Sequence, residues 1–192
     1  NKSKQNQKKI NKKEYHLVTD LKEIDNWIKE AEEVGEVAVD TETSSLDPHQ
    51  ADLIGVSLSS KIGKACYIPI GHRSKKCLSK DVVLKKLKPL LEDPSVKKIG
   101  QNIKFDFIVL YKQGITISSM EDTMLMSYVL DAGKNRHNMD TLSEIHLGHK
   151  TISFKEIVGT GKKEINFSDV EIDKAKDYAA EDADITFRLY KK

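Results

Sequence analysis

The sequence is poor in cysteine and lacks long hydrophobic runs. Its 192 residues include only Cys66 and Cys77, which match no zinc spacing and are too few for a disulfide framework. A reducing, cytoplasmic setting is therefore expected. No apolar stretch is long enough to cross a membrane and no internal repeat is evident, so the composition predicts a soluble protein with one domain and a sizeable core.

The net charge of +2 conceals an uneven distribution of charge. Residues 1–13 carry six lysines and no acid, which leaves 26 basic and 30 acidic residues, a net charge of −4, in the remainder. Residues 1–14 lack the Arg-rich pattern of a targeting peptide and are predicted to be a disordered basic linker before a folded domain at 15–192. The mildly acidic body argues against a broad electrostatic clamp for nucleic acid and favours local binding of a strand end.

An acidic pair ends a strand-like segment early in the domain. Residues 36–42 (EVAVDTE) alternate and contain β-branched side chains, which predicts a short buried strand. Side chains two positions apart project from the same face of a strand. Asp40 and Glu42 are therefore expected to point the same way.

A third acid lies at the start of a predicted helix in the middle of the chain. A strand-like run at residues 96–100 is followed by a helical pattern that stops at Gly114. Asn102 suits the N-cap of this helix, and Asp106 falls one turn inside it.

The fourth acid lies in a long helix predicted over residues 169–190. Ser168 with Glu171 three residues later has the pattern of a capping box at its start. Tyr178 and Asp182 are four residues apart, so they share one face of this helix. Alanines surround them, and unpaired carboxylates beside such apolar residues would be costly unless they bind something.

Carboxylate oxygens are the ligands that magnesium prefers, together with substrate phosphate. Two such ions about 4 Å apart can bind both the attacking and the leaving oxygen of a phosphoryl displacement. Taken singly, each acid also has a bland interpretation, because Asp182 could lie on a solvated helix face and Asp106 could simply favour the helix dipole. Together, Asp40, Glu42, Asp106 and Asp182 indicate a two-metal nuclease.

Three motifs resemble those of a known family. Residues 40–47 (DTETSSLD), 100–106 (GQNIKFD) and 178–184 (YAAEDAD) resemble, in order and interval, the exonuclease motifs of the proofreading domain of bacterial-type family A DNA polymerases. The resemblance also covers residues 136–142 (RHNMDTL) and 149–154 (HKTISF) and runs from about Tyr15 to the C-terminus.

The resemblance implies a ribonuclease H-like α/β exonuclease fold, with a mixed central sheet flanked by helices and a helical C-terminal half. It implies 3′→5′ hydrolysis of single-stranded DNA ends with two divalent ions, Mg²⁺ or Mn²⁺, held by the four acids. Tyr178 would orient the attacking water, because an ordinary tyrosine pKa near 10 makes it a poor base. The chain begins with Asn1 and ends directly after a long helix, so we expect a domain excised from a longer chain. The resemblance implies that a polymerase domain follows it, and we expect a monomer.

Substrate contacts are expected from a second group of side chains. Leu46 and Phe154 resemble the family's base-wedging and base-stacking residues, although flanking isoleucines allow Phe154 to be a core residue instead. Phe105 stands where relatives often have tyrosine, which keeps the ring and removes a hydroxyl. The predicted substrate-binding residues are Thr43, Leu46, Gln101, Asn102, Phe105, Arg136 and Phe154.

Two other interpretations fit the same motifs. One is an RNA-trimming or repair exonuclease, because DNA and RNA offer the metals the same phosphodiester. The other is a catalytically silent scaffold or DNA-binding module of a polymerase. His146 and His149 are interpreted as surface residues, and Glu181 and Asp184 as acids without a role.

The remaining pattern predicts short strands near residues 53–59 and 65–70, which with 36–42 form an antiparallel meander. Helices are expected at the following segments: residues 20–34, with a capping box of Asp20 and Glu23 and Gly35 at the end, then 79–92, 103–113, 122–130 and 139–147.

Overall fold

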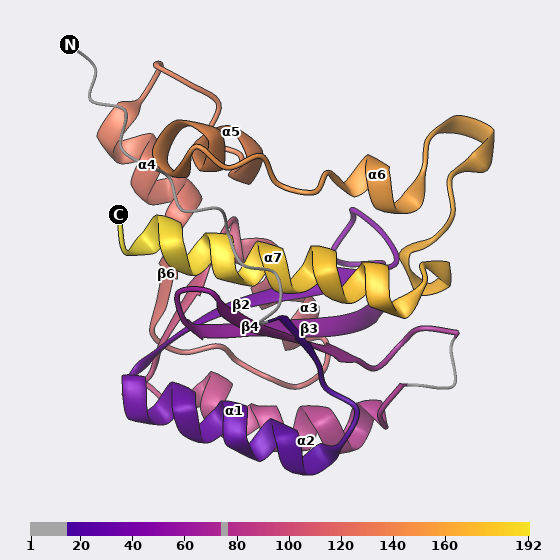
Figure 1. Cartoon of the computed structure of the whole chain (residues 1–192). Helices are drawn as coiled ribbons and strands as arrows, with labels where there is room; N and C mark the ends of the chain where they lie inside the picture. Colours follow the sequence, from indigo (N-terminus) through magenta and orange to yellow (C-terminus); the bar gives the residue numbers. More distant parts are fainter. Residues whose placement is uncertain (1–14, 74–76) are drawn as a thin grey trace.

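The computed structural model describes residues 15–73 and 77–192, so the predicted basic linker at 1–14 lies outside the described residues. Within the described ranges, six strands form one mixed sheet in the order β1-β4-β3-β2-β5-β6 (Figure 1). The strands are β1 (Tyr15–Leu17), β2 (Glu36–Thr43), β3 (Leu53–Lys61), β4 (Lys64–Pro69), β5 (Lys97–Gly100) and β6 (Met120–Asp122).

Helices cover both faces of the sheet (Figure 1). They are α1 (Leu21–Val34), α2 (Lys80–Glu92), α3 (Ile103–Tyr111), α4 (Thr123–Asp131), α5 (Met139–Leu142), the π-helix Ser143–Leu147, α6 (Phe154–Val158), the 3-10 turns Gly161–Lys163 and Phe167–Asp169, and α7 (Ile172–Tyr190). The predicted α/β fold with a mixed sheet and a helical C-terminal half is therefore confirmed.

The sheet places the acidic strand at its centre. The predicted antiparallel meander of β2, β3 and β4 is confirmed, and β5 pairs with the other edge of β2 in parallel. The short strands β1 and β6, which have three residues each, were not predicted. Their pairing partners lie far away in the sequence, in β4 and β5, so no local pattern marks them.

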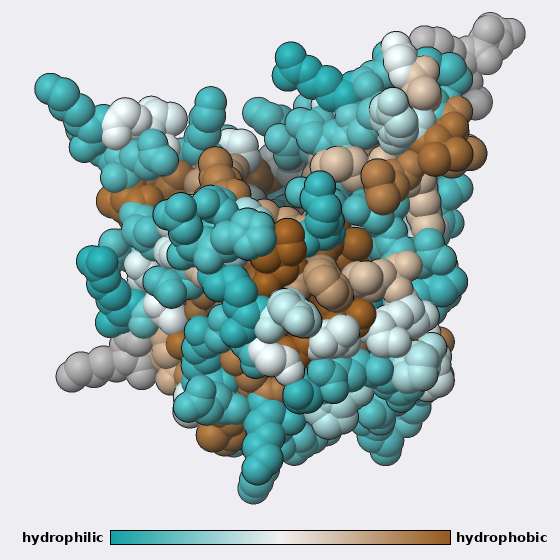
Figure 2. Space-filling model, turned by 180° about the vertical axis from the view of Figure 1, so that it is seen from behind, coloured by the Kyte–Doolittle hydropathy of each residue, from teal (hydrophilic) through white to brown (hydrophobic). Residues whose placement is uncertain are grey.

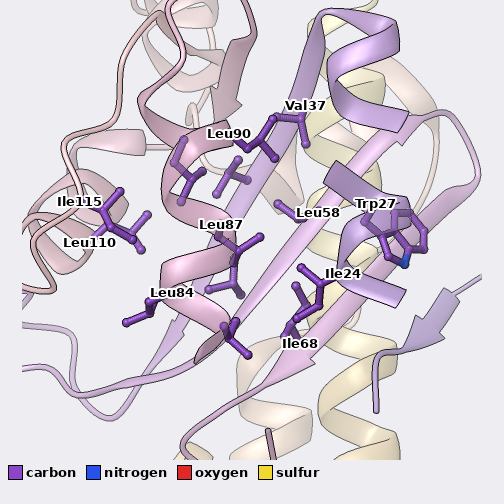
Figure 3. Close-up of a cluster of buried hydrophobic side chains, with 14 of the residues drawn as sticks. Ile24, Trp27, Val37, Leu58, Ile68, Leu84, Leu87, Leu90, Leu110 and Ile115 are labelled. Carbon is purple, nitrogen blue, oxygen red and sulfur yellow. The ribbon is translucent and has the colours of Figure 1, made fainter. Parts of the chain in front are cut away.

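The main hydrophobic core lies between the sheet and the pair α1 and α2. Ile24 and Trp27 on α1 and Leu87 on α2 point toward Leu58 and Ile68 of the sheet (Figure 3). Leu87 and Ile24 are completely buried, and full burial of a side chain of this size contributes about 1.5–3 kcal/mol of transfer free energy. This core covers one face of the sheet with α1 and α2, and the opposite face is available to α7.

Helix α7 packs against that opposite face because it presents small side chains to the strands. Ala175, Ala179, Ala180 and Ala183 are all completely buried. Alanine lets the helix axis approach the sheet closely, and α7 contacts β1 through β5 along its length. Polar side chains on this helix are consequently buried as well.

Local signals for helix ends were confirmed in part. Asp20 accepts a hydrogen bond from the Lys22 N–H at the start of α1, and Gly35 ends that helix in the left-handed region at φ 75°. Glu23, however, accepts from the Thr19 N–H at 3.1 Å and not from Asp20.

The predicted capping box at the start of α7 was wrong. Ser168 lies in the preceding 3-10 turn, where its N–H donates to Asn166, and α7 begins only at Ile172. The segment chosen for its capping pattern is thus a separate turn.

The surface carries several exposed hydrophobic side chains. Leu125, Tyr128, Val129 and Leu130 of α4 are all exposed. Figure 2 shows hydrophobic residues at the upper right, the side on which α4 lies after the half-turn from Figure 1. Among the helices in residues 15–73 and 77–192, none combines the length and the hydropathy needed to span a bilayer.

Candidate active site

The site begins at the central strand β2. Asp40 and Glu42 lie on the same face, as the alternation of a strand requires, with Glu42 buried and Asp40 half-buried. Gly55 of β3 stands opposite Glu42 in the antiparallel register. A Cβ atom at Gly55 would lie only 2.2–2.4 Å from ring and hydroxyl atoms of Tyr67, so glycine is needed for that ring to lie across the strand beside the acids.

Helix α7 brings the next two groups to the same place. Asp182 is 8% exposed, and Tyr178 precedes it by one helical turn. One carboxylate oxygen from each of Asp40, Glu42 and Asp182 lies within 4.8 Å of the others. Residues separated by 140 positions in the chain therefore converge on one point.

Asp106 is held differently from the other three acids. It is buried one turn inside α3, and its Oδ1 accepts hydrogen bonds from the Thr41 N–H at 2.9 Å and the Thr41 Oγ1 at 2.6 Å. Thr41 lies between Asp40 and Glu42 on β2, so these bonds attach the start of α3 to the acidic strand. Burial and the negative charge of Asp40 raise the pKa of Asp106 well above its ordinary range.

Asn102, which directly precedes α3, does not cap the helix as predicted. Its side chain makes no capping hydrogen bond, and its backbone is left-handed at φ 63°. The carboxylate of Asp122 instead accepts from the Asn102 N–H at 2.9 Å and the Ile103 N–H at 3.1 Å. This arrangement turns the chain sharply between β5 and α3 and lets Asn102 line the pocket.

The four carboxylates are short of positive partners. Burial raises the pKa of Asp40 to about 6 and, together with neighbouring negative charge, raises the pKa values of Glu42, Asp106 and Asp182 well above their ordinary range. Glu42 Oε1 is buried and has no hydrogen-bond partner among the described residues. Clustered hard oxygen ligands, one of them unpaired, fit a divalent cation such as Mg²⁺.

A pocket of about 740 Å³ opens above these acids. Asp40, Glu42 and Asp182 line it together with side chains of the loop after β2, of α3 and of the segment from α6 to α7. Its apolar lining residues are Leu46, Phe105, Phe154, Ile165 and Phe167. A pocket with acids on one side and aromatic rings on another can hold a phosphate and an adjoining base.

Aromatic rings are stacked along one side of this pocket. Phe154 lies parallel to Phe167, with 6.2 Å between ring centroids and 8° between planes, and meets Tyr178 edge-on at 6.1 Å. Phe167 is buried, whereas Phe154 remains 38% exposed and Leu46 is 88% exposed. Phe154 is therefore a surface-facing member of an aromatic cluster and not a core residue.

Four of the predicted substrate-binding residues besides Phe154 differ in their placement. Thr43 and Asn102 line the pocket. Arg136 is exposed in the loop between α4 and α5 and is not among the lining residues. The side-chain amide of Gln101 is already engaged, because its Oε1 accepts from Thr123 Oγ1 at 2.5 Å and its Nε2 donates to the carbonyl of His137 at 2.8 Å.

The interpretation of three other residues was wrong. Glu181 and Asp184 are completely buried and hydrogen-bonded, and His149 pairs with Glu181 at 2.9 Å. The positions of Glu181 and Asp184 among the buried alanines of α7 were a usable signal, since a buried carboxylate requires a partner. Of Glu181, Asp182 and Asp184 on α7, only Asp182 lines the pocket.

Residues 15–192 match the family described as 3′-5′ exonuclease. The chain belongs to this exonuclease family. DNA polymerase I of Pseudomonas aeruginosa is 45% identical to this chain over 183 residues, which cover 92% of the chain and 20% of the polymerase. The chain therefore spans about a fifth of the length of the curated relatives that it matches.

Solved structures of other proteins share the fold of this chain. Brucella melitensis NrnC is 28% identical with a TM-score of 0.68, over 91% of the chain and 77% of NrnC. Another structure of the same protein contains bound Mg²⁺. Trypanosoma brucei RNase D has a TM-score of 0.73 over 94% of the chain and 57% of RNase D, and at 16% identity it supports the fold alone. The ribonuclease H-like exonuclease fold is thus established.

Proposed function

We propose that this exonuclease removes nucleotides from single-stranded or frayed DNA 3′ ends by two-metal-ion phosphodiester hydrolysis. We further propose that it proofreads for a polymerase domain in the same longer chain and acts in the cytoplasm. The observation that carries the proposal is the convergence of Asp40, Glu42 and Asp182 within 4.8 Å at a pocket lined by aromatic rings. The 45% identity to a DNA polymerase I supports DNA as the substrate.

The metal ligands are the four acids. Asp40, Glu42 and Asp182 would hold Mg²⁺ or Mn²⁺ with their clustered oxygens, and Asp106 would contribute its Oδ2, because Oδ1 is occupied by Thr41. When bound, the ions lower the pKa of water and stabilise negative charge on the phosphate oxygens. The Mg²⁺ found in NrnC supports this choice of metal.

Tyr178 would position the attacking water without accepting its proton. Burial and the negative charges of Asp182, Glu42 and Asp40 raise the pKa of Tyr178 well above its ordinary value. The hydroxyl therefore stays protonated at neutral pH and can only donate or accept hydrogen bonds. Bound metals would have to supply the activation of the water, and Tyr178 would contribute its orientation.

The terminal bases would contact the apolar part of the pocket. Phe154 offers an exposed ring face, and stacking of a base on such a ring is worth about 1–3 kcal/mol. Leu46 and Phe105 would complete the base-binding surface. Thr43 and Asn102, which also line the pocket, would lie near the sugar-phosphate backbone of the DNA. Gln101 would act indirectly, because its amide donates to His137 next to Arg136 and so fixes the loop from which Arg136 can reach phosphate.

An RNA-trimming or repair exonuclease is the second candidate. The 28% identity to NrnC favours it, and a metal site alone does not distinguish the two nucleic acids because both present the same phosphodiester. The clustering of Asp40, Glu42 and Asp182, with Glu42 Oε1 buried and unpaired, favours catalysis over a silent scaffold.

A single assay tests the proposal. DNA and RNA strands labelled at either end would be incubated with the chain in Mg²⁺, Mn²⁺ or chelator, and the products resolved by length. We expect stepwise shortening of DNA from the 3′ end that requires a divalent ion. Preference for RNA would favour the second candidate, and no metal-dependent cleavage of either strand would refute the catalytic function.

A further inference from the structure

A segment without regular structure, residues 149–152, lies against α7 near the active site. We name it the strap. It connects the π-helix Ser143–Leu147, through Gly148, to Ser153 and α6, and its first carbonyl, that of His149, accepts a hydrogen bond from Ser143 Oγ at 2.8 Å. Thr151 Oγ1 donates to Asp140 Oδ1 of α5 at 2.5 Å. The strap therefore has defined attachments on its α5 side.

One buried carboxylate holds the strap on the other side. Glu181 of α7 is completely buried, its Oε1 lies 2.9 Å from His149 Nε2, and its Oε2 accepts from the Ile152 N–H at 2.6 Å. Because a carboxylate has no proton to donate, His149 Nε2 must carry the hydrogen of this bond. The two oxygens of one side chain thus bind both ends of the strap.

The strap leads directly to the exposed ring of the pocket. Phe154, two residues after Ile152, is the first residue of α6, and Ser153 caps this helix in a reciprocal pair with Glu156. A shift at Ile152 would be transmitted to Phe154 over only two residues. The ring's stacking on Phe167 and its edge contact with Tyr178 depend on that position.

We propose that His149 and Glu181 are positioning residues that hold the ring of Phe154 in place for the terminal base of the strand. Glu181 and Asp182 are adjacent on α7 but point to different partners, so the helix that carries a metal ligand also fixes the base-binding surface. Helix α7 thereby sets the position of the base relative to the metal site. This inference rests on the proposed role of Phe154 in substrate binding.

The test is a double-mutant cycle between His149→Ala and Phe154→Ala, with steady-state cleavage of a single-stranded oligodeoxynucleotide. We expect each variant to raise KM about tenfold with a much smaller change in kcat, since the loss of one stacked base is at stake. The double variant should be no worse than Phe154→Ala alone, because residues acting through one contact are not additive. Binding of Mn²⁺, measured by calorimetry, involves no base and should be unchanged in His149→Ala.

Two further variants keep the test decisive. His149→Gln retains a side-chain N–H donor and should recover most of the affinity for the oligonucleotide. His146→Ala removes the same kind of side chain from the preceding π-helix and should leave KM unaltered. If His149→Ala melts below the assay temperature, Glu181→Gln, which keeps an acceptor for the Ile152 N–H, takes its place in the cycle.

The possible failures can be told apart. Unchanged KM in Phe154→Ala would reject the base-binding role within the proposed function. Additive effects of His149→Ala and Phe154→Ala, or an unaltered KM in a folded His149→Ala, would overturn the positioning role while leaving the metal site intact. Loss of Mn²⁺ binding in His149→Ala would also overturn it, because the substitution would then act on the metal site.

Discussion

Thr41 donates two hydrogen bonds to the same oxygen of Asp106, one from its backbone N–H and one from its hydroxyl. The pair joins β2 to α3 across 65 residues of sequence and leaves Oδ2 of Asp106 for another partner. Thr41 thus orients the carboxylate of Asp106 beside the cluster of Asp40, Glu42 and Asp182.

Replacing Thr41 tests that orientation. Thr41→Val keeps the shape and the backbone donor but removes the hydroxyl, and a lost hydrogen bond to a charged group costs about 1.5–3 kcal/mol. We expect cleavage of DNA ends to fall roughly tenfold to a hundredfold. Thr41→Ser, which keeps the hydroxyl, is the matched control, and equal rates in the two variants would show that the bond does not matter for catalysis.

The four acids can be tested one at a time. Asp40→Asn, Glu42→Gln, Asp106→Asn and Asp182→Asn should each lower the rate of cleavage at least about a thousandfold, because metal stabilisation of several kcal/mol is lost. The rates should be measured with saturating Mg²⁺ and with a 3′ end that is already single-stranded. Near-native rates of cleavage in any two of these variants would contradict the assignment of the four acids as metal ligands.

Tyr178 should behave differently from the ligands. Tyr178→Phe removes one hydroxyl and retains the ring that touches Phe154, so we expect a smaller loss of kcat, on the order of tenfold to a thousandfold. Binding of Mn²⁺, followed by calorimetry, should survive this change. If it does not, Tyr178 belongs to the metal site.

The metal-free chain should lose stability as pH rises. The folded-state pKa of Asp40 is about 6, above its ordinary value of 3.8, so its protonated form favours folding at low pH and that contribution is lost as pH rises through 6. In chelator we expect the melting temperature to fall between about pH 4 and pH 7, with Asp40→Asn less sensitive to pH and more stable than the parent chain at pH 7.

Added metal should cancel this loss, since a ligand at a hundred times its dissociation constant stabilises the folded state by about 2.7 kcal/mol. Scanning calorimetry with chelator and with millimolar Mg²⁺ at each pH provides the check. A melting temperature that changes with neither pH nor added metal would mean that the acids are not clustered in solution.

Replacing Asp184 should destabilise the folded chain, whereas replacing Asp182 should not. Its carboxylate accepts from Tyr15 at 2.8 Å, the Gly63 N–H at 2.8 Å and Arg188 Nε at 3.0 Å. Asp184→Ala would leave Arg188 without its partner inside the fold and should lower the free energy of unfolding by about 3–5 kcal/mol. Urea unfolding in chelator measures this, and Asp182→Asn under the same conditions should be no less stable than the parent chain.

Helix α7 illustrates how far the sequence could be interpreted. The spacing of Tyr178 and Asp182 predicted a shared face, and the structure places both at the pocket. The same spacing rule assigned Glu181 and Asp184 to other faces but could not show that those faces are buried too, because burial depends on the strap and on β1 packing around the helix. A helical period describes directions and does not identify what lies in each direction.

Local patterns in the sequence were sufficient to predict the strands and helices with strong periodicity, the common face of Asp40 and Glu42, and the nuclease motifs. These features are local, since alternation and helical spacing follow from backbone geometry over a few residues. Other contacts depend on how the whole chain folds: Thr41 holds Asp106, the amide of Gln101 is already hydrogen-bonded, and Glu181 anchors the strap before Phe154. Each of those contacts joins residues far apart in the chain, and their partners are chosen by how the sheet and α7 pack together.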